Sequence, residues 1–241
     1  MFGTIHRVIS LGNWCSTKAT MNLYFHPHEP WAKTRKSHGD LFDWMMIGDY
    51  NHLASTLSTN LDDIFEIHDL MKMDNIINEH GQCVFGNSIY NVKHKMIWPH
   101  LFDSISGFDH SKEKFDTFFE NNDTIKTIQS KMTYLKNKFI SAKDKRTLYI
   151  ITYNHHKYIP ENIRPLKPSF ETLINVRNSL RMIRGNDNFM LLFICPQQPS
   201  LMHENIILTN NENTDYFYNE TISEDAKRIF DAFTFELDYI T

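Results

Sequence analysis

Hydrophobic positions along the chain fall into short continuous runs and longer periodic stripes. A short β-type run occupies residues 5–11, continuous apolar runs occupy residues 147–153 and 189–195, and a weaker run occupies residues 205–209. Runs of this length that are apolar throughout are typical of strands buried on both faces, as in a parallel sheet covered by helices. We therefore predict that the first three runs are neighbouring, mostly parallel strands of one central sheet.

The periodic stripes between these runs predict helices. Apolar residues recur at spacings of three and four through residues 115–139, with a break at residues 121–123, and again through residues 170–183. Ser169 before the second stripe and Gly185 after it are typical helix start and stop signals. This alternation of strands and helices predicts an α/β domain with a mostly parallel central sheet flanked by helices.

The remaining segments complete this prediction. A last helix is expected from Ser223 onward, and residues 82–98 are expected to form a hairpin with its turn at residues 86–88. The apolar block at residues 41–47 and this hairpin are expected to cover the carboxyl edge of the sheet, where α/β proteins usually build their sites. A single domain over residues 1–241 fits this length.

Composition excludes several classes of protein. Hydrophobic residues make up 41% and charged residues 22% of the chain, which excludes a disordered or fibrous protein. A net charge of -4 without a dense basic block disfavours a nucleic-acid partner. No apolar run is long enough to span a bilayer, and the first residues lack the hydrophobic block of a signal peptide, so no membrane partner is expected.

Cysteine usage favours a reducing compartment, and hence a cytoplasmic protein. Cys15, Cys83 and Cys195 are odd in number and far apart, unlike a disulfide framework. Cys83 and Cys195 lie in strand-like segments and are interpreted as structural. No pair of cysteines has the spacing of a zinc site, and no glycine-rich nucleotide loop is present, so neither a metal nor a cofactor is predicted.

Cys15 stands apart because it follows the first strand and precedes a helix-compatible stretch that runs to Tyr24. A cysteine at a helix N-terminus meets unsatisfied N–H groups and the positive end of the helix dipole, which favour the thiolate. Gly12 would allow the sharp turn that this position needs. The alternative interpretation is that Cys15 is a small buried hydrophobe at the end of a strand.

A cysteine nucleophile needs a base, which is usually a histidine. His100 lies in an otherwise apolar segment with Asp103 close by, and His155 and His156 follow the second predicted strand. Either region could supply the base, whereas a core histidine or an exposed loop would account for the same residues without catalysis.

Three sequence blocks together resemble a known family. Residues 10–15 (SLGNWC), 41–45 (LFDWM) and 99–102 (PHLF) resemble, in order and spacing, a bacterial family described as papain-like cysteine peptidases, most of whose members have no assigned function. Leu41 stands where that family has proline, and His100 is followed by Leu-Phe-Asp rather than directly by an acid. The resemblance covers roughly the first 105 residues.

The resemblance implies Cys15 as nucleophile and His100 as base. Asp43 is the first choice for the carboxylate that orients the imidazole, and Asp103 is the second; Asp43 could instead form a local turn. The oxyanion and substrate region would be formed by the residues around the cysteine and by one tryptophan of the second block, namely Gly12, Asn13, Trp14, Ser16 and Trp44.

These residues predict an acyl-transfer enzyme that works through a thioester on an amide, an ester or an acylated sugar. The expected partner is a small-molecule, peptide or glycan acyl substrate, and hydrolysis and transfer are both open. A cysteine at the end of the first strand is also similar to the nucleophile position of SGNH-type esterases. A papain-like α+β fold is the alternative to the layered fold, and a carbohydrate- or protein-binding module with an inert Cys15 is the alternative to an enzyme.

Overall fold

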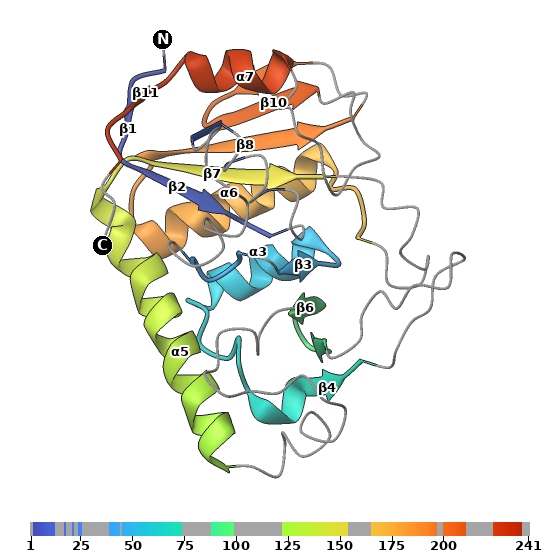
Figure 1. The fold of residues 1–241 in the computed structure, drawn as a ribbon. Helices are drawn as coiled ribbons and strands as arrows, with labels where there is room; N and C mark the ends of the chain where they lie inside the picture. Colours follow the sequence, from blue (N-terminus) through green and yellow to red (C-terminus); the bar gives the residue numbers. More distant parts are fainter. Residues whose placement is uncertain are drawn as a thin grey trace.

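The chain forms a three-layer arrangement around a central sheet (Figure 1). The computed structural model describes residues 2–12, 17, 21, 24–25, 39–43, 45–73, 88–98, 122–153, 165–196, 200–210 and 224–237. The five strands of the central sheet lie in the order β2-β7-β8-β10-β9. Their bounds are Arg7–Ser10 (β2), Thr147–Thr152 (β7), Phe189–Cys195 (β8), Leu201–His203 (β9) and Ile206–Asn210 (β10).

Strands β2, β7, β8 and β10 are parallel, and β9 is an antiparallel edge strand. The predicted arrangement of the first three strand-like runs is therefore confirmed, and the weaker fourth run forms β10. The first run is not a single strand, however. His6 interrupts it, so that β1 (Thr4–Ile5) pairs with β11 (Thr234–Phe235), while β2 joins the central sheet.

Both faces of the central sheet are buried at β7 and β8, which explains why these two strands are almost continuously apolar. On one face, side chains such as Tyr149, Leu191 and Phe193 pack in one hydrophobic core with helices α3, α5 and α6. On the other face, Leu148 and Leu192 pack with α7 in a second core. The helix bounds are Tyr50–Ser58 (α3), Asn122–Ser141 (α5), Phe170–Arg184 (α6) and Glu224–Asp231 (α7).

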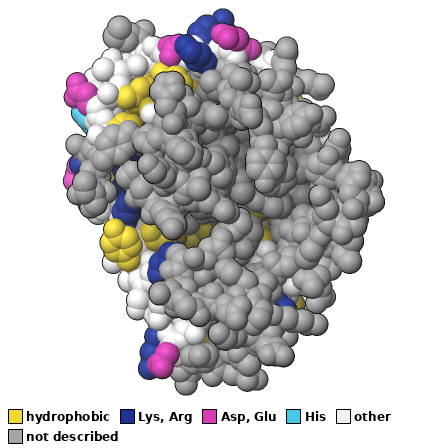
Figure 2. Space-filling view, viewed as in Figure 1, with side chains coloured by type: hydrophobic (Ala, Val, Ile, Leu, Met, Phe, Trp, Pro, Cys, Tyr) yellow, Lys and Arg dark blue, Asp and Glu magenta, His cyan; other side chains and the backbone are white. Residues whose placement is uncertain are grey.

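The ends of α6 follow the predicted signals. The Ser169 hydroxyl accepts a hydrogen bond from the Thr172 N–H, and Gly185 ends the helix with a φ of 70°, in the left-handed region that glycine adopts without strain. The predicted start of the last helix at Ser223 lies outside the described residues, and α7 is described from Glu224. Figure 2 shows acidic and basic side chains beside one another over α7, where Lys227 pairs with Asp231 and Arg228 with Asp225.

A second, antiparallel sheet lies beyond α3 and shares the first hydrophobic core (Figure 1). Its strand order is β3-β6-β5-β4, with bounds Met46–Ile47 (β3), Leu70–Lys72 (β4), Ile89–Asn91 (β5) and Met96–Trp98 (β6). Two short 3-10 helices, η1 (Ile67–Asp69) and η3 (Ala142–Asp144), precede β4 and β7.

The hairpin predicted in residues 82–98 is present, but its predicted turn is wrong. The turn lies at residues 92–95, between β5 and β6, whereas residues 86–88 were expected to form it. The glycine-containing segment instead precedes β5. The true turn contains no glycine and is closed by the Asn91 side chain, which accepts a hydrogen bond from the His94 N–H. Among the described residues, no helix is long and apolar enough to cross a membrane.

Candidate functional site

The carboxyl end of β2 is held by a chain of hydrogen bonds that continues past the strand. The Leu11 N–H donates to the Ile150 carbonyl on β7, and the Gly12 N–H donates to the Ser10 hydroxyl at 3.2 Å. Gly12 has a φ of 87°. Because only glycine adopts this region freely, the sharp turn predicted at this residue is present.

The Thr17 side chain forms hydrogen bonds at the carboxyl ends of both β2 and β7. Its hydroxyl donates to the Gly12 carbonyl at 2.7 Å and accepts from the Thr152 N–H at 3.1 Å. In a regular parallel ladder the Thr152 N–H would bond to the carbonyl of the neighbouring strand, so the hydroxyl takes the place of a continued β2. Thr17 is fully buried and helical. Gly12 and Thr17, the described residues on either side of 13–16, are therefore both held at the carboxyl ends of β2 and β7.

The second sequence block packs directly against Gly12. A Cβ atom on Gly12 would lie 2.5 Å from Cγ1 of Ile47 and 3.2 Å from the carbonyl oxygen of Met45. A contact of 2.5 Å is shorter than real Cβ contacts, so glycine is needed for space as well as for backbone conformation. The expectation that residues 41–47 reach the carboxyl edge of the sheet is thus confirmed at this point.

The strand that precedes the third block in the chain pairs with the strand that follows the second. Met46 and Ile47 of β3 lie opposite Ile97 and Met96 of β6, and the two strands are antiparallel. The third block itself, residues 99–102, lies outside the described residues. β3 thus contacts Gly12 of the first block and pairs with the strand that leads to the third.

Asp43 lies in a turn that is fixed on both sides. Its Oδ2 accepts a hydrogen bond from the Asp40 N–H at 2.9 Å, and its own N–H donates to the Asp40 carbonyl. Asp40 is in turn paired with Arg7 at 2.6 Å and with Lys138 at 3.5 Å, which ties the turn to β2 and α5. The local turn role weighed for Asp43 is therefore real, and its Oδ1 is also buried.

Several predicted site residues lie outside the described residues. They are Asn13, Trp14, Cys15, Ser16, Trp44 and His100, together with Asp103 and the second histidine pair, His155 and His156. The distance between the predicted nucleophile and its base is therefore untested, and the pairing stays a prediction.

Cys195 has the buried character expected of a structural cysteine. It ends β8, and burial raises the pKa of its thiol, although the charge and hydrogen bond of Lys167 act in the opposite direction. A buried neutral thiol is a poor nucleophile. Among the described residues, no group of histidine, cysteine and acidic side chains is arranged to hold a metal ion.

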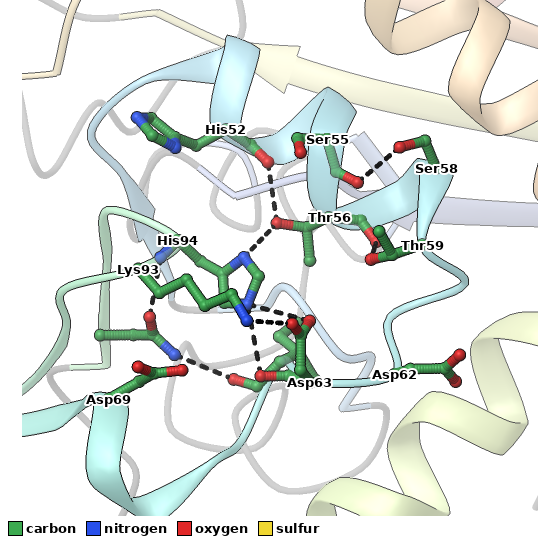
Figure 3. Close-up of polar contacts among 12 residues, drawn as sticks. His52, Ser55, Thr56, Ser58, Thr59, Asp62, Asp63, Asp69, Lys93 and His94 are labelled. Carbon is green, nitrogen blue, oxygen red and sulfur yellow. Dashed lines mark hydrogen bonds and ion pairs between the residues drawn. The ribbon is translucent and has the colours of Figure 1, made fainter.

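A polar cluster that the sequence did not indicate surrounds His94 (Figure 3). Its Nδ1 lies 2.6 Å from the Thr56 hydroxyl on α3, and its Nε2 lies 3.2 Å from Oδ1 of Asp63. Lys93 also pairs with Asp63, and the hydrogen bond from Lys93 holds the pKa of this carboxyl below its usual range. The residue types match a hydroxyl–imidazole–carboxylate triad.

The His94 cluster is nevertheless not a nucleophilic site. Thr56 is only 1% exposed, and its hydroxyl donates to the His52 carbonyl within α3 at 2.8 Å. A substrate carbonyl could not reach this oxygen without unfolding the helix. The cluster therefore joins α3 to the β5–β6 turn and does not bind substrate.

Comparisons with family models, with curated protein sequences and with solved structures find no match for this chain. The functional assignment therefore depends on the residues themselves and on where the fold places them.

Proposed function

We propose that this chain is a cysteine-dependent acyl-transfer enzyme with Cys15 as its nucleophile. The observation that supports the proposal is the Thr17 hydroxyl, which binds the Gly12 carbonyl and the Thr152 N–H and so holds the described residues on either side of 13–16 at one edge of the sheet. Cys15 is two residues from Thr17, a separation that a peptide chain spans in at most about 7 Å. We therefore propose that its thiol lies at the carboxyl edge of the parallel sheet, which is where α/β proteins bind their ligands.

The pairing of β3 with β6 supports His100 as the base. The register pairs Met46 with Ile97, so each step back along β3 matches a step forward along β6. Along the chain, Asp43 lies three positions before Met46 and His100 lies three positions after Ile97, although Asp43 itself lies in a turn and not in the ladder. The carboxylate of Asp43 is held by the Asp40 N–H, so it would present a fixed orientation to an imidazole.

In this mechanism, His100 accepts the proton of the Cys15 thiol, and the thiolate attacks the acyl carbonyl carbon of the substrate. The carbonyl π electrons move to oxygen, where backbone N–H groups of residues 13–16 stabilise the negative charge. Collapse of this intermediate forms the thioester and expels the leaving group, which takes the proton from His100. Water or an acceptor hydroxyl then attacks the thioester and releases Cys15.

Acylation of the intact protein tests this proposal. Incubation with activated esters and acyl thioesters should add one acyl mass, located on the Cys15 peptide by mass spectrometry. Cys15→Ala should abolish the adduct, and His100→Ala should slow its formation by about a thousandfold because base and nucleophile act as a unit. Cys195→Ala is the matched control and should acylate like the wild type, since its thiol is buried.

Two results would contradict the proposal. A mass adduct that survives Cys15→Ala would show that another group reacts. A wild-type protein that never acylates across a broad panel of donors would favour the non-catalytic binding module. Loss of acylation in His155→Ala or His156→Ala, with His100→Ala unaffected, would keep the chemistry and reassign the base.

A further inference from the structure

His94 fastens the turn between β5 and β6 to two other parts of the chain (Figure 3). One ring nitrogen meets the Thr56 hydroxyl on α3, and the other meets Asp63 in the segment that follows α3. The backbone N–H of His94 donates to the Asn91 side chain, whose amide donates to the Ile64 carbonyl at 3.1 Å. His94 is 6% exposed, so these contacts are made away from solvent.

The Thr56 hydroxyl can satisfy the imidazole in either protonation state. When both ring nitrogens carry a proton, Nδ1–H donates to the Thr56 oxygen, whose own hydrogen goes to the His52 carbonyl, 2.8 Å away. When only Nε2 carries a proton, the hydroxyl turns and donates to Nδ1. Nε2–H donates to the backbone carbonyl of Asp63 in both states, so neither state leaves a buried ring nitrogen without a partner.

The same turn holds β3 beside the carboxyl edge of the central sheet. The Lys95 carbonyl accepts from the Gly48 N–H at 2.8 Å, directly after β3, and β3 contacts Gly12 through Ile47. β6 begins one residue after Lys95 and ends at Trp98, two residues before His100. A shift of the turn would therefore move both the strand that contacts Gly12 and the strand that leads to the predicted base.

We infer that Thr56 and His94 are positioning residues: they hold the β5–β6 hairpin, from which the chain continues to His100, in one place whether the imidazole is neutral or charged. This inference rests on the proposed function for its effect on catalysis, but not for the structural part.

The charged groups around His94 keep one state over the range in which imidazoles titrate, about pH 5–8. Asp63 stays ionised there, because the Lys93 hydrogen bond keeps the pKa of this carboxyl below its usual range. Lys93 stays protonated, since the same contact raises its pKa, and Asp69 and Glu66 are the further charges that act on it. The imidazoles of His52 on α3 and of His68 beside Asp69 also lie near this cluster, and Thr56→Ser leaves both in place, so this variant controls for them.

The structural part is tested by unfolding midpoints of Thr56→Val and Thr56→Ser between pH 8 and pH 5. Valine keeps the shape but removes the oxygen that accepts from Nδ1–H, and an unpaired buried donor on a cation costs more than an unpaired neutral acceptor. The amount by which Thr56→Val lowers the unfolding midpoint below that of the wild type should therefore grow as the pH falls. Thr56→Ser should follow the wild type. Thr133→Val, on the exposed side of α5, is the control for the substitution itself.

The catalytic part is tested by the alkylation rate of Cys15 with iodoacetamide at pH 6.5, followed by peptide mass spectrometry. Thr56→Val should slow Cys15 alkylation by about tenfold, the rate equivalent of one ordinary hydrogen bond. Thr56→Ser and Thr133→Val should stay within about twofold of the wild type, because a factor of two is well below the effect of one hydrogen bond.

The outcomes separate the two proposals. If wild-type Cys15 reacts no faster than the buried Cys195, the proposed function fails. The unfolding series still decides whether the contact of His94 with Thr56 holds the β5–β6 hairpin. If Cys15 reacts fast and equally fast in Thr56→Val, the positioning role is overturned while the proposed function stands. If Thr56→Val lowers the unfolding midpoint by the same amount at every pH, the inference that Thr56 pairs with both the neutral and the charged imidazole is overturned.

Discussion

At the scale of single residues, Arg184 shows how a buried charge is accommodated without a carboxylate among its described partners. Its guanidinium is 4% exposed and donates to the Thr147 and Tyr149 hydroxyls. The other described acceptors are backbone carbonyls, those of Ala142, Lys143, Lys145 and Asn188. Three of these carbonyls lie at or next to η3, which follows α5 directly, so the negative end of a helix dipole faces the cation.

Arg184→Lys should therefore be strongly destabilising although it keeps the charge. An ammonium group cannot reach acceptors spread around a planar fork, so several buried carbonyls would lose their donor, at a total cost of about 2–4 kcal/mol. Urea unfolding at pH 7 measures the difference. Arg181→Lys is the matched control on the same helix: Arg181 pairs with Asp187 at the surface and should change stability by at most about 0.5 kcal/mol. Equal losses in both variants would contradict this account.

At the scale of elements, the sequence was informative where a segment's own pattern decides its structure. β7 and β8 are long enough for continuous apolarity to be recognised, and α6 carries its start and stop signals in Ser169 and Gly185. The strands of the second sheet are two or three residues long, too short for any periodicity to appear. Their positions depend on partners far away in the chain, and so the turn of the hairpin was misplaced.

The same distinction applies to the candidate site: features with a local sequence pattern were predicted, and features that depend on remote partners were missed. Order and spacing of three blocks predicted a common site; the described residues show the contact of Gly12 with Ile47 and the pairing of β3 with β6, the strand that precedes the third block. Thr17 and His94 were missed because their partners are remote: Thr17 binds Thr152, 135 positions away. No local pattern signals a hydroxyl that replaces a strand carbonyl.

The effects of backbone strain and of lack of space at Gly12, at the end of β2, can be told apart by comparing it with two other glycines. Gly12 has both a positive φ and a Cβ clash, Gly185 has a positive φ in open space, and Gly39 has neither. Alanine should therefore have almost no effect at Gly39, cost about 1 kcal/mol at Gly185, and cost about 2–4 kcal/mol at Gly12. Chemical denaturation of the three variants measures this order.

The functional readout of the same series is Cys15 alkylation. Gly12→Ala should slow it, since the added methyl group pushes Ile47 away from the turn that begins the Cys15 segment. Gly185→Ala, at the far end of α6, should leave the rate unchanged. An alkylation rate in Gly12→Ala equal to that of the wild type would remove the link between this contact and the site.

At the scale of the whole molecule, the two ends of the chain pack against each other. β1 pairs with β11, and the helical residues that follow Thr17 pack against the C-terminal region. Tyr24 stacks on Phe230 with ring centroids 4.6 Å apart, and its hydroxyl donates to Asp231 at 2.8 Å. The helical residues that follow Thr17 are therefore held by residues from the opposite end of the sequence.

This contact predicts a loss of stability at alkaline pH. Burial, together with the hydrogen bond and the charge of Asp231, raises the pKa of Tyr24 to about 12. In the unfolded chain a tyrosine titrates near pH 10, so the folded state binds this proton more tightly. The stabilisation is fully present below about pH 10 and is lost as the pH rises from about 10 to about 12.

Tyr24→Phe should lower the unfolding midpoint at pH 7, because the hydrogen bond to Asp231 is lost while the ring contacts remain. The gap between this variant and the wild type should then close between pH 10 and pH 12, since phenylalanine has no proton to lose. Tyr134→Phe, at a ring 61% exposed on α5, should match the wild type throughout. If Tyr24 anchors the site, Tyr24→Phe should also slow Cys15 alkylation at pH 7; a gap that stays constant up to pH 12 would show that the hydroxyl contact does not hold the two ends of the chain together.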